Sequence, residues 1–138
     1  RGFTGVAGPL WRGAGARAGR GETRGLEAAR ADAAGGIVAA MMSNPCLVSG
    51  RGRFDTIAMR AANGAFAVKA GAEGVHGALL PEIGLGVAVK IDDGARRAAQ
   101  VAMAAILDYL GVLDAEAKIA LAGLLETPVL NAKGARVG

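Results

Sequence analysis

The run Lys69-Ala-Gly-Ala-Glu-Gly-Val75 constrains the fold of this chain more than any other part of the sequence. In this run an ionisable lysine ends a short apolar stretch, and two glycines bracket a glutamate. Glycine has no Cβ, so it lets the backbone turn tightly and approach a small molecule closely. We therefore interpret residues 66–97, which surround this run, as the wall of a pocket.

Three apolar runs around this turn have the composition and spacing of β-strands. They cover residues 65–69, 75–80 and 86–91, and the turn signal Asn63-Gly64 precedes the first of them. In the last run larger apolar side chains alternate with alanine and lysine, as a half-buried strand requires. Because the connections between the runs are short, we expect neighbouring strands to be antiparallel.

Helical periodicity marks four further segments. We expect helices at residues 26–42, at 55–60 with Asp55 or Thr56 as N-cap, from Asp92 or Asp93 to residue 110, and from Asp114 to about residue 127. The third helix is expected to bury one apolar stripe, formed by Ala98, Val101, Ala102, Ala105, Ile106 and Tyr109. The fourth is expected to bury Ile119, Leu121, Leu124 and Leu125.

This order of helix, strands and helices predicts an α/β (α+β) fold, in which a mainly antiparallel sheet is flanked by helices. A chain of 138 residues is long enough for one domain with a real core. Alanine contributes heavily to the 52% of hydrophobic residues, and only 4% of residues are aromatic. We therefore expect small side chains and close helix packing in that core.

Residues 1–36 differ in composition from the rest, because Gly, Ala and Arg fill 25 of these 36 positions. Little periodicity is visible there, so we expect 1–36 to be poorly ordered and 37–138 to form the domain. A GC-rich gene read in the wrong frame yields the same three residue types, which suggests the hypothesis that part of this segment is non-native. Since the chain starts with Arg1 and ends without a closing element, we interpret it as a fragment.

The charge pattern disfavours two classes of partner. The net charge is +4, but the arginines of residues 1–30 are scattered among acidic residues, without the compact basic run of a nucleic-acid binder. No apolar stretch reaches the length of a membrane span, and glycines interrupt the only candidate for a signal peptide. A single cysteine, Cys46, cannot form an intrachain disulfide, so the expected location is cytoplasmic.

Lys69 is the strongest single candidate for chemistry. At a strand end beside glycine-rich backbone, a lysine can be partly desolvated, which makes its neutral amine available as a base or proton carrier. The alternative is an ion pair with Glu73 that only fixes the loop. Glu73 is then either this structural partner or a carboxylate that orients a donor.

Arg53, Asp55 and Thr56 form a second cluster on a glycine-flanked turn. They could hold a substrate carboxylate, or they could be a capped helix with a solvated arginine. His76 lies inside an apolar run, which favours a satisfied core or edge histidine over a general base. Cys46 is interpreted as a small buried hydrophobe. One Cys and one His cannot form a zinc site without several carboxylates, so no metal ligand is assigned.

Five short motifs occur in order along residues 40–138: NP at 44–45, GRGRFDT at 50–56, KAGAEGV at 69–75, VKIDDG at 89–94 with Arg96 or Arg97 after it, and TPVLN at 127–131 with Gly134 and Val137 after it. In order and spacing they resemble the C-terminal part of the type II asparaginases typified by the inducible rhizobial enzyme. Each motif alone is weak, but their combination is specific.

This resemblance implies a fold similar to serine-dependent glutaminases and β-lactamases, and the hydrolysis of asparagine to aspartate and ammonia by Ser/Lys chemistry. It implies that Lys69 is the active-site lysine. It further implies a substrate-binding or supporting role for Arg53, Asp55, Thr56, Gly71, Glu73 and Asp93.

The Ser-x-x-Lys motif of that family is not found in this sequence, and neither is the cysteine and lysine segment that helps to bind zinc in the family. We therefore expect an incomplete fold, assign no nucleophile and no cofactor, and expect the chain alone to be inactive. The alternative is a non-catalytic remnant that serves as an interaction domain. An incomplete sheet would expose apolar surface, so a homo-oligomer such as a dimer is expected.

Overall fold

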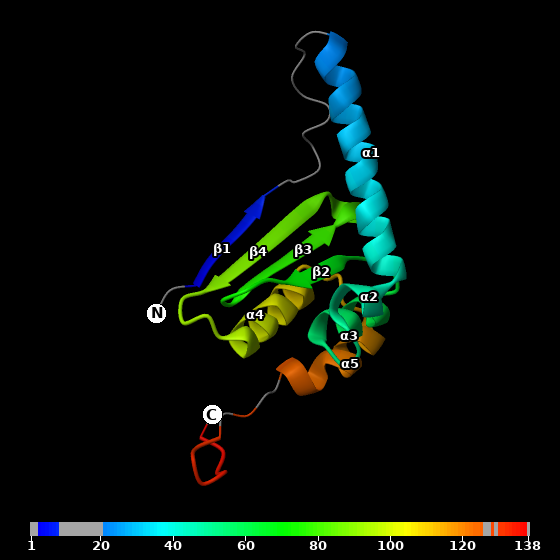
Figure 1. Cartoon of the computed structure of the whole chain (residues 1–138). Helices are drawn as coiled ribbons and strands as arrows, with labels where there is room; N and C mark the ends of the chain where they lie inside the picture. The colour runs from blue at the N-terminus through cyan, green and yellow to red at the C-terminus, as the bar shows by residue number, and fades with distance from the viewer. Residues whose placement is uncertain (1–2, 9–20, 126–127, 129, 138) are drawn as a thin grey trace.

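The computed structural model of the chain describes residues 3–8, 21–125, 128 and 130–137 (Figure 1). Four strands form one antiparallel sheet in the order β1-β4-β3-β2. They are β1 (Phe3–Gly8), β2 (Ala67–Ala70), β3 (Val75–Leu80) and β4 (Leu85–Ile91). The fold class predicted from the sequence is confirmed, and each of the three predicted strands is present to within two residues at either end.

Strand β1 and the first part of helix α1 (Gly21–Ser43) lie in the stretch that was expected to be poorly ordered. Strand β1 pairs with β4 along its whole length, from Phe3 opposite Ile91 to Gly8 opposite Gly86. The glycine pair at 35 and 36 does not interrupt α1, which ends before Pro45 as expected. The division of the chain into residues 1–36 and 37–138 stays a prediction.

Helices cover one face of this sheet (Figure 1). Helix α4 (Arg96–Tyr109) packs on β3 and β4, while α3 (Phe54–Ala61) packs on β2. Helix α5 (Ala115–Leu125) contacts both of these helices, and the short helix α2 (Pro45–Ser49) packs beside α3 and β2. The other short element, η2 (Pro81–Ile83), forms the connection between β3 and β4. The largest buried apolar side chains of the resulting core are Phe66, Met59, Leu80, Met103, Leu107 and Leu121.

The buried face of α4 differs from the expected one. The helix buries Ala99, Met103, Ala104 and Leu107, whereas Tyr109 of the expected stripe is 90% exposed. Because alanine covers much of this helix, its apolar surface is wide, and the longer side chains of Met103 and Leu107 determine which part of it meets the sheet. The predicted buried face was therefore wrong: it lies about one residue earlier in the sequence of the helix than the observed face.

Helix α5 is apolar on most of its surface, so periodicity alone could not orient it. Leu121 is buried as expected, but Ile119 is 77% exposed. The buried contact face is formed instead by Ala117 and Leu121, which lie one helical turn apart.

Only one of the expected acidic caps is observed. Asp114 Oδ1 accepts a hydrogen bond of 2.7 Å from the Ala117 N–H at the start of α5. Helix α3 begins at Phe54 after an extended Arg53, so neither Asp55 nor Thr56 is its cap. Asp93 lies outside α4, and its Oδ1 accepts from the Ala95 N–H at 2.9 Å in the turn before the helix. These two predictions were wrong because both carboxylates find other backbone partners.

Several large apolar side chains remain exposed on different helices, among them Ile37 on α1, Leu47 on α2 and Ile119 on α5. Among the described residues, no helix combines the length and the apolar character needed to cross a membrane. These exposed side chains are therefore features of the helical surface, and their bearing on assembly is considered below.

Candidate functional site

A cavity of about 240 Å³ lies where α2 ends, α3 begins, β2 ends and α4 begins. Its polar lining residues are Ser49, Arg53, Asp55, Lys69, Arg96 and Gln100, and Gly71 also borders it. Three of these side chains are cationic and one is a carboxylate. A cavity of this size and charge suits a small anionic or zwitterionic molecule.

Four of the seven residues predicted for the site meet at this cavity: Arg53, Asp55, Lys69 and Gly71. Thr56, Glu73 and Asp93 are not among its lining residues. Ser49 and Gln100 were missed, and neither carries a sequence signal of its own. Arg96 was noted only as a motif member following residues 89–94, and its position at the start of α4 is what brings it to the cavity.

The Asp55 carboxylate connects three elements beneath this cavity. Its Oδ2 accepts a hydrogen bond from Ser49 Oγ at 2.5 Å and one from the Ala70 N–H at 2.9 Å. Its Oδ1 lies 2.8 Å from His76 Nε2. Asp55 is only 2% exposed, so its charge depends on these three partners.

Burial raises the pKa of the Asp55 carboxyl, because it penalises the charged form. Hydrogen bonds from His76, Ser49 and Ala70, together with the charge interaction with His76, lower the pKa by more. The net pKa lies below the ordinary value of 3.8. Asp55 is therefore an ionised acceptor at neutral pH and a weak base.

His76 is fully buried in β3, opposite Ala70 of β2. Its ring packs edge-on against Phe54, with the centroids 5.1 Å apart and the planes at 73°. Because Asp55 is an acceptor, Nε2 carries the proton that it donates to Oδ1. Nδ1 has no hydrogen-bond partner among the described residues. We expected a core histidine with its hydrogen bonds made, and the structure shows a buried histidine with a hydrogen bond at Nε2 only.

Lys69 lies at the exposed edge of the cavity, on strand β2. Its ammonium donates a hydrogen bond of 2.7 Å to the carbonyl of Ala70. Lys69 is exposed and also lines the cavity, so the expected partial desolvation stays a prediction. The expected alternative, an ion pair with Glu73, is not observed among the described contacts either. A catalytic role for Lys69 stays a prediction.

Glu73 and Gly71 shape the turn that follows Lys69. Glu73 adopts a left-handed conformation with φ of 51°, and its carbonyl accepts from the ammonium of Lys90. The Gly71 N–H donates to the Val75 carbonyl at 2.8 Å. A Cβ on Gly71 would lie 3.1 Å from Cβ of Val75, so the turn favours glycine at this position.

Thr56 has a structural position. Its hydroxyl is buried and lies 2.6 Å from the Gly50 carbonyl and 3.1 Å from the Pro45 carbonyl. A hydroxyl has one proton to donate, so the shorter contact is the stronger bond. Thr56 thereby ties the start of α3 to the α2 segment, which carries Ser49 to the cavity.

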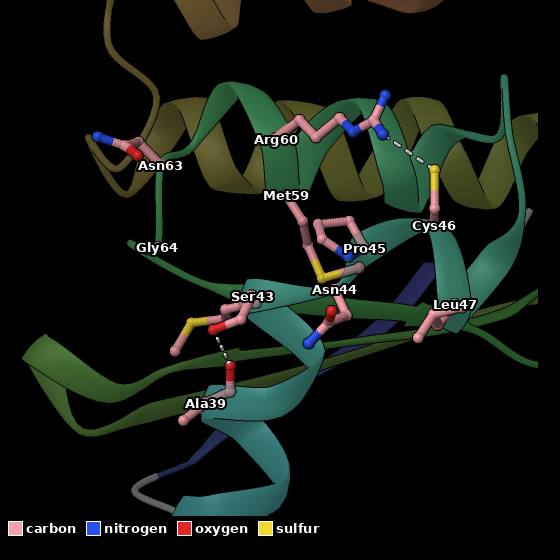
Figure 2. A pocket seen from close by; sticks show the side chains of 11 residues that line it. Ala39, Ser43, Asn44, Pro45, Cys46, Leu47, Met59, Arg60, Asn63 and Gly64 are labelled. Atoms are coloured by element: carbon pink, nitrogen blue, oxygen red, sulfur yellow. Dashed lines mark hydrogen bonds between the residues drawn. The ribbon is translucent and has the colours of Figure 1, made fainter.

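A second cavity, of about 610 Å³, lies between the end of α1, α2 and α3 (Figure 2). Its one charged lining residue is Arg60, whose Nη2 lies 3.0 Å from the half-buried Sγ of Cys46. Cys46 is therefore a hydrogen-bond acceptor on a cavity wall, which differs from the predicted buried hydrophobe. This cavity is larger than the first but holds none of the seven predicted site residues.

The zinc that the resemblance implies does not fit the described residues. Cys46 contacts Arg60 and His76 contacts Asp55, in separate parts of the molecule. Among the described residues, no three or more His, Cys, Asp or Glu side chains are grouped so as to hold a metal ion. The chemistry of the small cavity is therefore derived from its lysine, arginines and carboxylate.

Comparison with known proteins agrees with the motifs noted in the sequence. The family model described as L-asparaginase II matches residues 6–138. A search of curated proteins finds no match. The family match covers nearly the whole chain, including the GRGRFDT and KAGAEGV motifs that supply Arg53, Asp55, Lys69 and Gly71 to the cavity. The chain belongs to the L-asparaginase II family.

Proposed function

We propose that this chain supplies the basic wall of an amide-hydrolysing site that converts asparagine to aspartate and ammonia. The observation that supports the proposal best is the cavity that brings Arg53, Lys69 and Arg96 together next to the buried Asp55. Membership of the L-asparaginase II family supports an amide substrate. Free asparagine carries a carboxylate, and arginine binds carboxylates through two parallel hydrogen bonds.

In this proposal Arg53 and Arg96 hold the α-carboxylate of the substrate at the cavity edge. Lys69 transfers a proton to or from the reacting groups, and the turn at Gly71 leaves room for the substrate beside the backbone. To act as a base, Lys69 must release the Ala70 carbonyl and lose a proton. Binding of a substrate near Lys69 would compete for the same ammonium protons.

The attacking nucleophile comes from residues outside this chain in our proposal. The sequence contains two serines, Ser43 and Ser49. Ser43 Oγ donates to the Ala39 carbonyl at 2.8 Å (Figure 2). Ser49 Oγ donates to Asp55, whose lowered pKa makes it a poor acceptor of the serine proton. Among the described contacts neither hydroxyl is hydrogen-bonded to a lysine amine, as Ser/Lys chemistry needs, so we expect the chain alone to release no ammonia.

A cytoplasmic homo-oligomer, such as a dimer, is part of the same proposal. The exposed side chains of Ile37, Leu47 and Ile119 would be shielded from water in an assembly. Light scattering across a range of protein concentrations tests this point. A monomer at every concentration would remove the oligomer from the proposal without affecting the cavity.

Two measurements on the purified chain test the enzymatic proposal. An ammonia assay with L-asparagine is expected to show no release above the rate in buffer. Calorimetry or NMR titration with L-aspartate, the reaction product, is expected to show binding with a Kd of about 1 mM, as for a small ligand held mainly by charge-assisted hydrogen bonds. D-aspartate and succinate serve as controls for recognition of the amino acid.

The two outcomes separate the competing interpretations. Turnover of asparagine by the 138-residue chain would contradict the assignment of the nucleophile to other residues. Absence of aspartate binding would contradict the substrate pocket and favour the non-catalytic remnant. If a longer version of the protein that includes a Ser-x-x-Lys segment hydrolyses asparagine, Lys69→Met in that protein is expected to abolish the activity, since methionine has a similar length and no amine.

A further inference from the structure

We infer that His76 is a positioning residue for Lys69, acting through Asp55 and the Ala70 peptide group. This inference rests on the proposed function in one respect, because it assumes that the orientation of Lys69 matters to the site. It concerns a buried residue that does not line the cavity, whereas Lys69, Ala70 and Asp55 all do.

The first step joins His76 to Asp55. His76 Nε2 donates to Asp55 Oδ1 at 2.8 Å, inside a core where both side chains are almost completely buried. The packing of Phe54 against the imidazole restricts rotation of the ring. Asp55 therefore has one oxygen held by a rigid buried donor, which fixes the direction in which its other oxygen points.

The second step joins Asp55 to the end of β2. The other oxygen, Oδ2, accepts from the Ala70 N–H at 2.9 Å. The carbonyl of the same residue accepts from the Lys69 ammonium at 2.7 Å. Ala70 is thus held at its N–H by the buried carboxylate and at its C=O by the cavity lysine. A rotation of the Asp55 carboxylate would change the backbone at Ala70 and move the acceptor that holds Lys69.

A purely structural role for His76 predicts something different. If His76 only fills space in the core, any side chain of similar size should leave Lys69 as it is. The unpartnered Nδ1 shows that the ring is not fully satisfied where it lies, so its hydrogen-bond capacity is used only toward Asp55 among the described residues. The donor at Nε2 is therefore the property that an experiment should change.

His76→Gln and His76→Met form a matched pair for this experiment. The two side chains have nearly the same length and volume, and glutamine can place an N–H near the position of Nε2 while methionine cannot. The rate of acetylation of Lys69 by an N-hydroxysuccinimidyl acetate reagent is measured by peptide mass spectrometry. Lys118, which pairs with Asp108 at 2.7 Å on the helical surface, serves as an internal control.

We expect His76→Met to raise the acetylation rate of Lys69 by about fivefold, the ratio that corresponds to loss of one net hydrogen bond. The reason is that an amine no longer held by the Ala70 carbonyl is more available to the reagent. We expect His76→Gln to restore a rate close to that of the wild type, and Lys118 to react equally in all three proteins. Equal Lys69 rates in His76→Met and the wild type would overturn the inference, as would equal increases in both variants.

A measurement on the wild type covers the case in which these core variants do not fold. Long-range ¹H–¹⁵N NMR spectra should show His76 protonated at Nε2, and hydrogen exchange should show the Ala70 amide strongly protected compared with Ala72 in the exposed turn. A His76 ring without a proton on Nε2, or an Ala70 amide that exchanges as fast as that of Ala72, would overturn the inference. None of these assays needs asparagine turnover, so a failure here is distinct from a failure of the proposed function.

Discussion

Gly74 packs directly against Gly94, so that a Cβ on Gly74 would lie 2.9 Å from the carbonyl carbon of Gly94. The contact joins the turn after Lys69 to the turn between β4 and α4. The Ile91 N–H reinforces it by donating to the Gly74 carbonyl at 3.1 Å. Since α4 carries Arg96 and the first turn follows Lys69, this contact helps to set two cationic groups of the cavity relative to each other.

Gly74→Ala is therefore expected to be strongly destabilising. Gly74 has φ of 71°, where a Cβ costs about 1–2 kcal/mol, and the clash with rigid backbone atoms adds about 1–3 kcal/mol. Gly64→Ala is the control, because Gly64 has φ of 91° but no atom within 4 Å of the position that a Cβ would take. Urea unfolding should show a clearly larger loss of unfolding free energy for Gly74→Ala than for Gly64→Ala. Equal losses would mean that the two turns are not in close contact in solution.

The low pKa of Asp55 predicts a loss of stability in acid. Because the folded-state pKa lies below the ordinary 3.8, the group contributes stability that is complete above that value and is lost as pH falls through the folded-state pKa. Denaturant unfolding of the wild type and of Asp55→Asn at a series of pH values checks this.

The stability difference between the wild type and Asp55→Asn is expected to be largest at neutral pH and to shrink below about pH 4. Asp92→Asn, at an exposed position after β4, is the control. Its unfolding free energy should follow that of the wild type over most of the pH series. A difference between the wild type and Asp55→Asn that stays constant down to acid pH would contradict the ionised, hydrogen-bonded state of Asp55.

Much of the sheet could be predicted because its signals are local. Alternation within residues 75–80 and 86–91 and the short connections between them are sufficient for antiparallel pairing. Lys69 and Gly71 were found because both lie in one unusual run of seven residues. Strand β1 was missed because its pairing with β4 joins residues more than 75 positions apart, in a segment whose own composition resembles a loop.

The contacts beneath the cavity could not be predicted, for a similar reason. Asp55 and His76 are 21 residues apart in the sequence, and each had a plausible local role, the first as a helix cap and the second as a core residue. Ser49 and Gln100 are ordinary polar residues until the fold brings α2 and α4 to the same cavity. A carboxylate with three partners is a property of the tertiary structure.

Thr56 gives a further prediction, about the connection between α2 and α3. Thr56→Val keeps the shape but removes the hydroxyl donor of the Gly50 carbonyl and the buried contact with the Pro45 carbonyl, which is expected to cost about 1–3 kcal/mol. Thr56→Ser retains the hydroxyl and should lose less stability, because only the methyl group is missing. Thermal or urea unfolding compares the two variants. A valine variant as stable as the wild type would show that the hydroxyl contact does not hold these helices together.

Arg53 and Arg96 give the last prediction, which concerns the ligand. All three arginines are exposed, but Arg53 and Arg96 line the small cavity and Arg51 does not, so Arg51→Gln is a matched control for Arg53→Gln and Arg96→Gln. Each cavity variant is expected to weaken L-aspartate binding by about ten- to a hundredfold, because a charge-assisted hydrogen bond to a carboxylate contributes about 1.5–3 kcal/mol.

Titrations at low and high salt distinguish this from general attraction by a basic surface. Exposed charges are screened over about 10 Å at 0.1 M salt, so long-range attraction should fade for all arginine variants alike. If Arg53 and Arg96 contact the carboxylate directly, the two cavity variants should bind L-aspartate more weakly than Arg51→Gln at every salt concentration. If Arg51→Gln loses as much affinity as the cavity variants, the ligand is attracted by the net charge of the chain and the cavity does not bind its carboxylate.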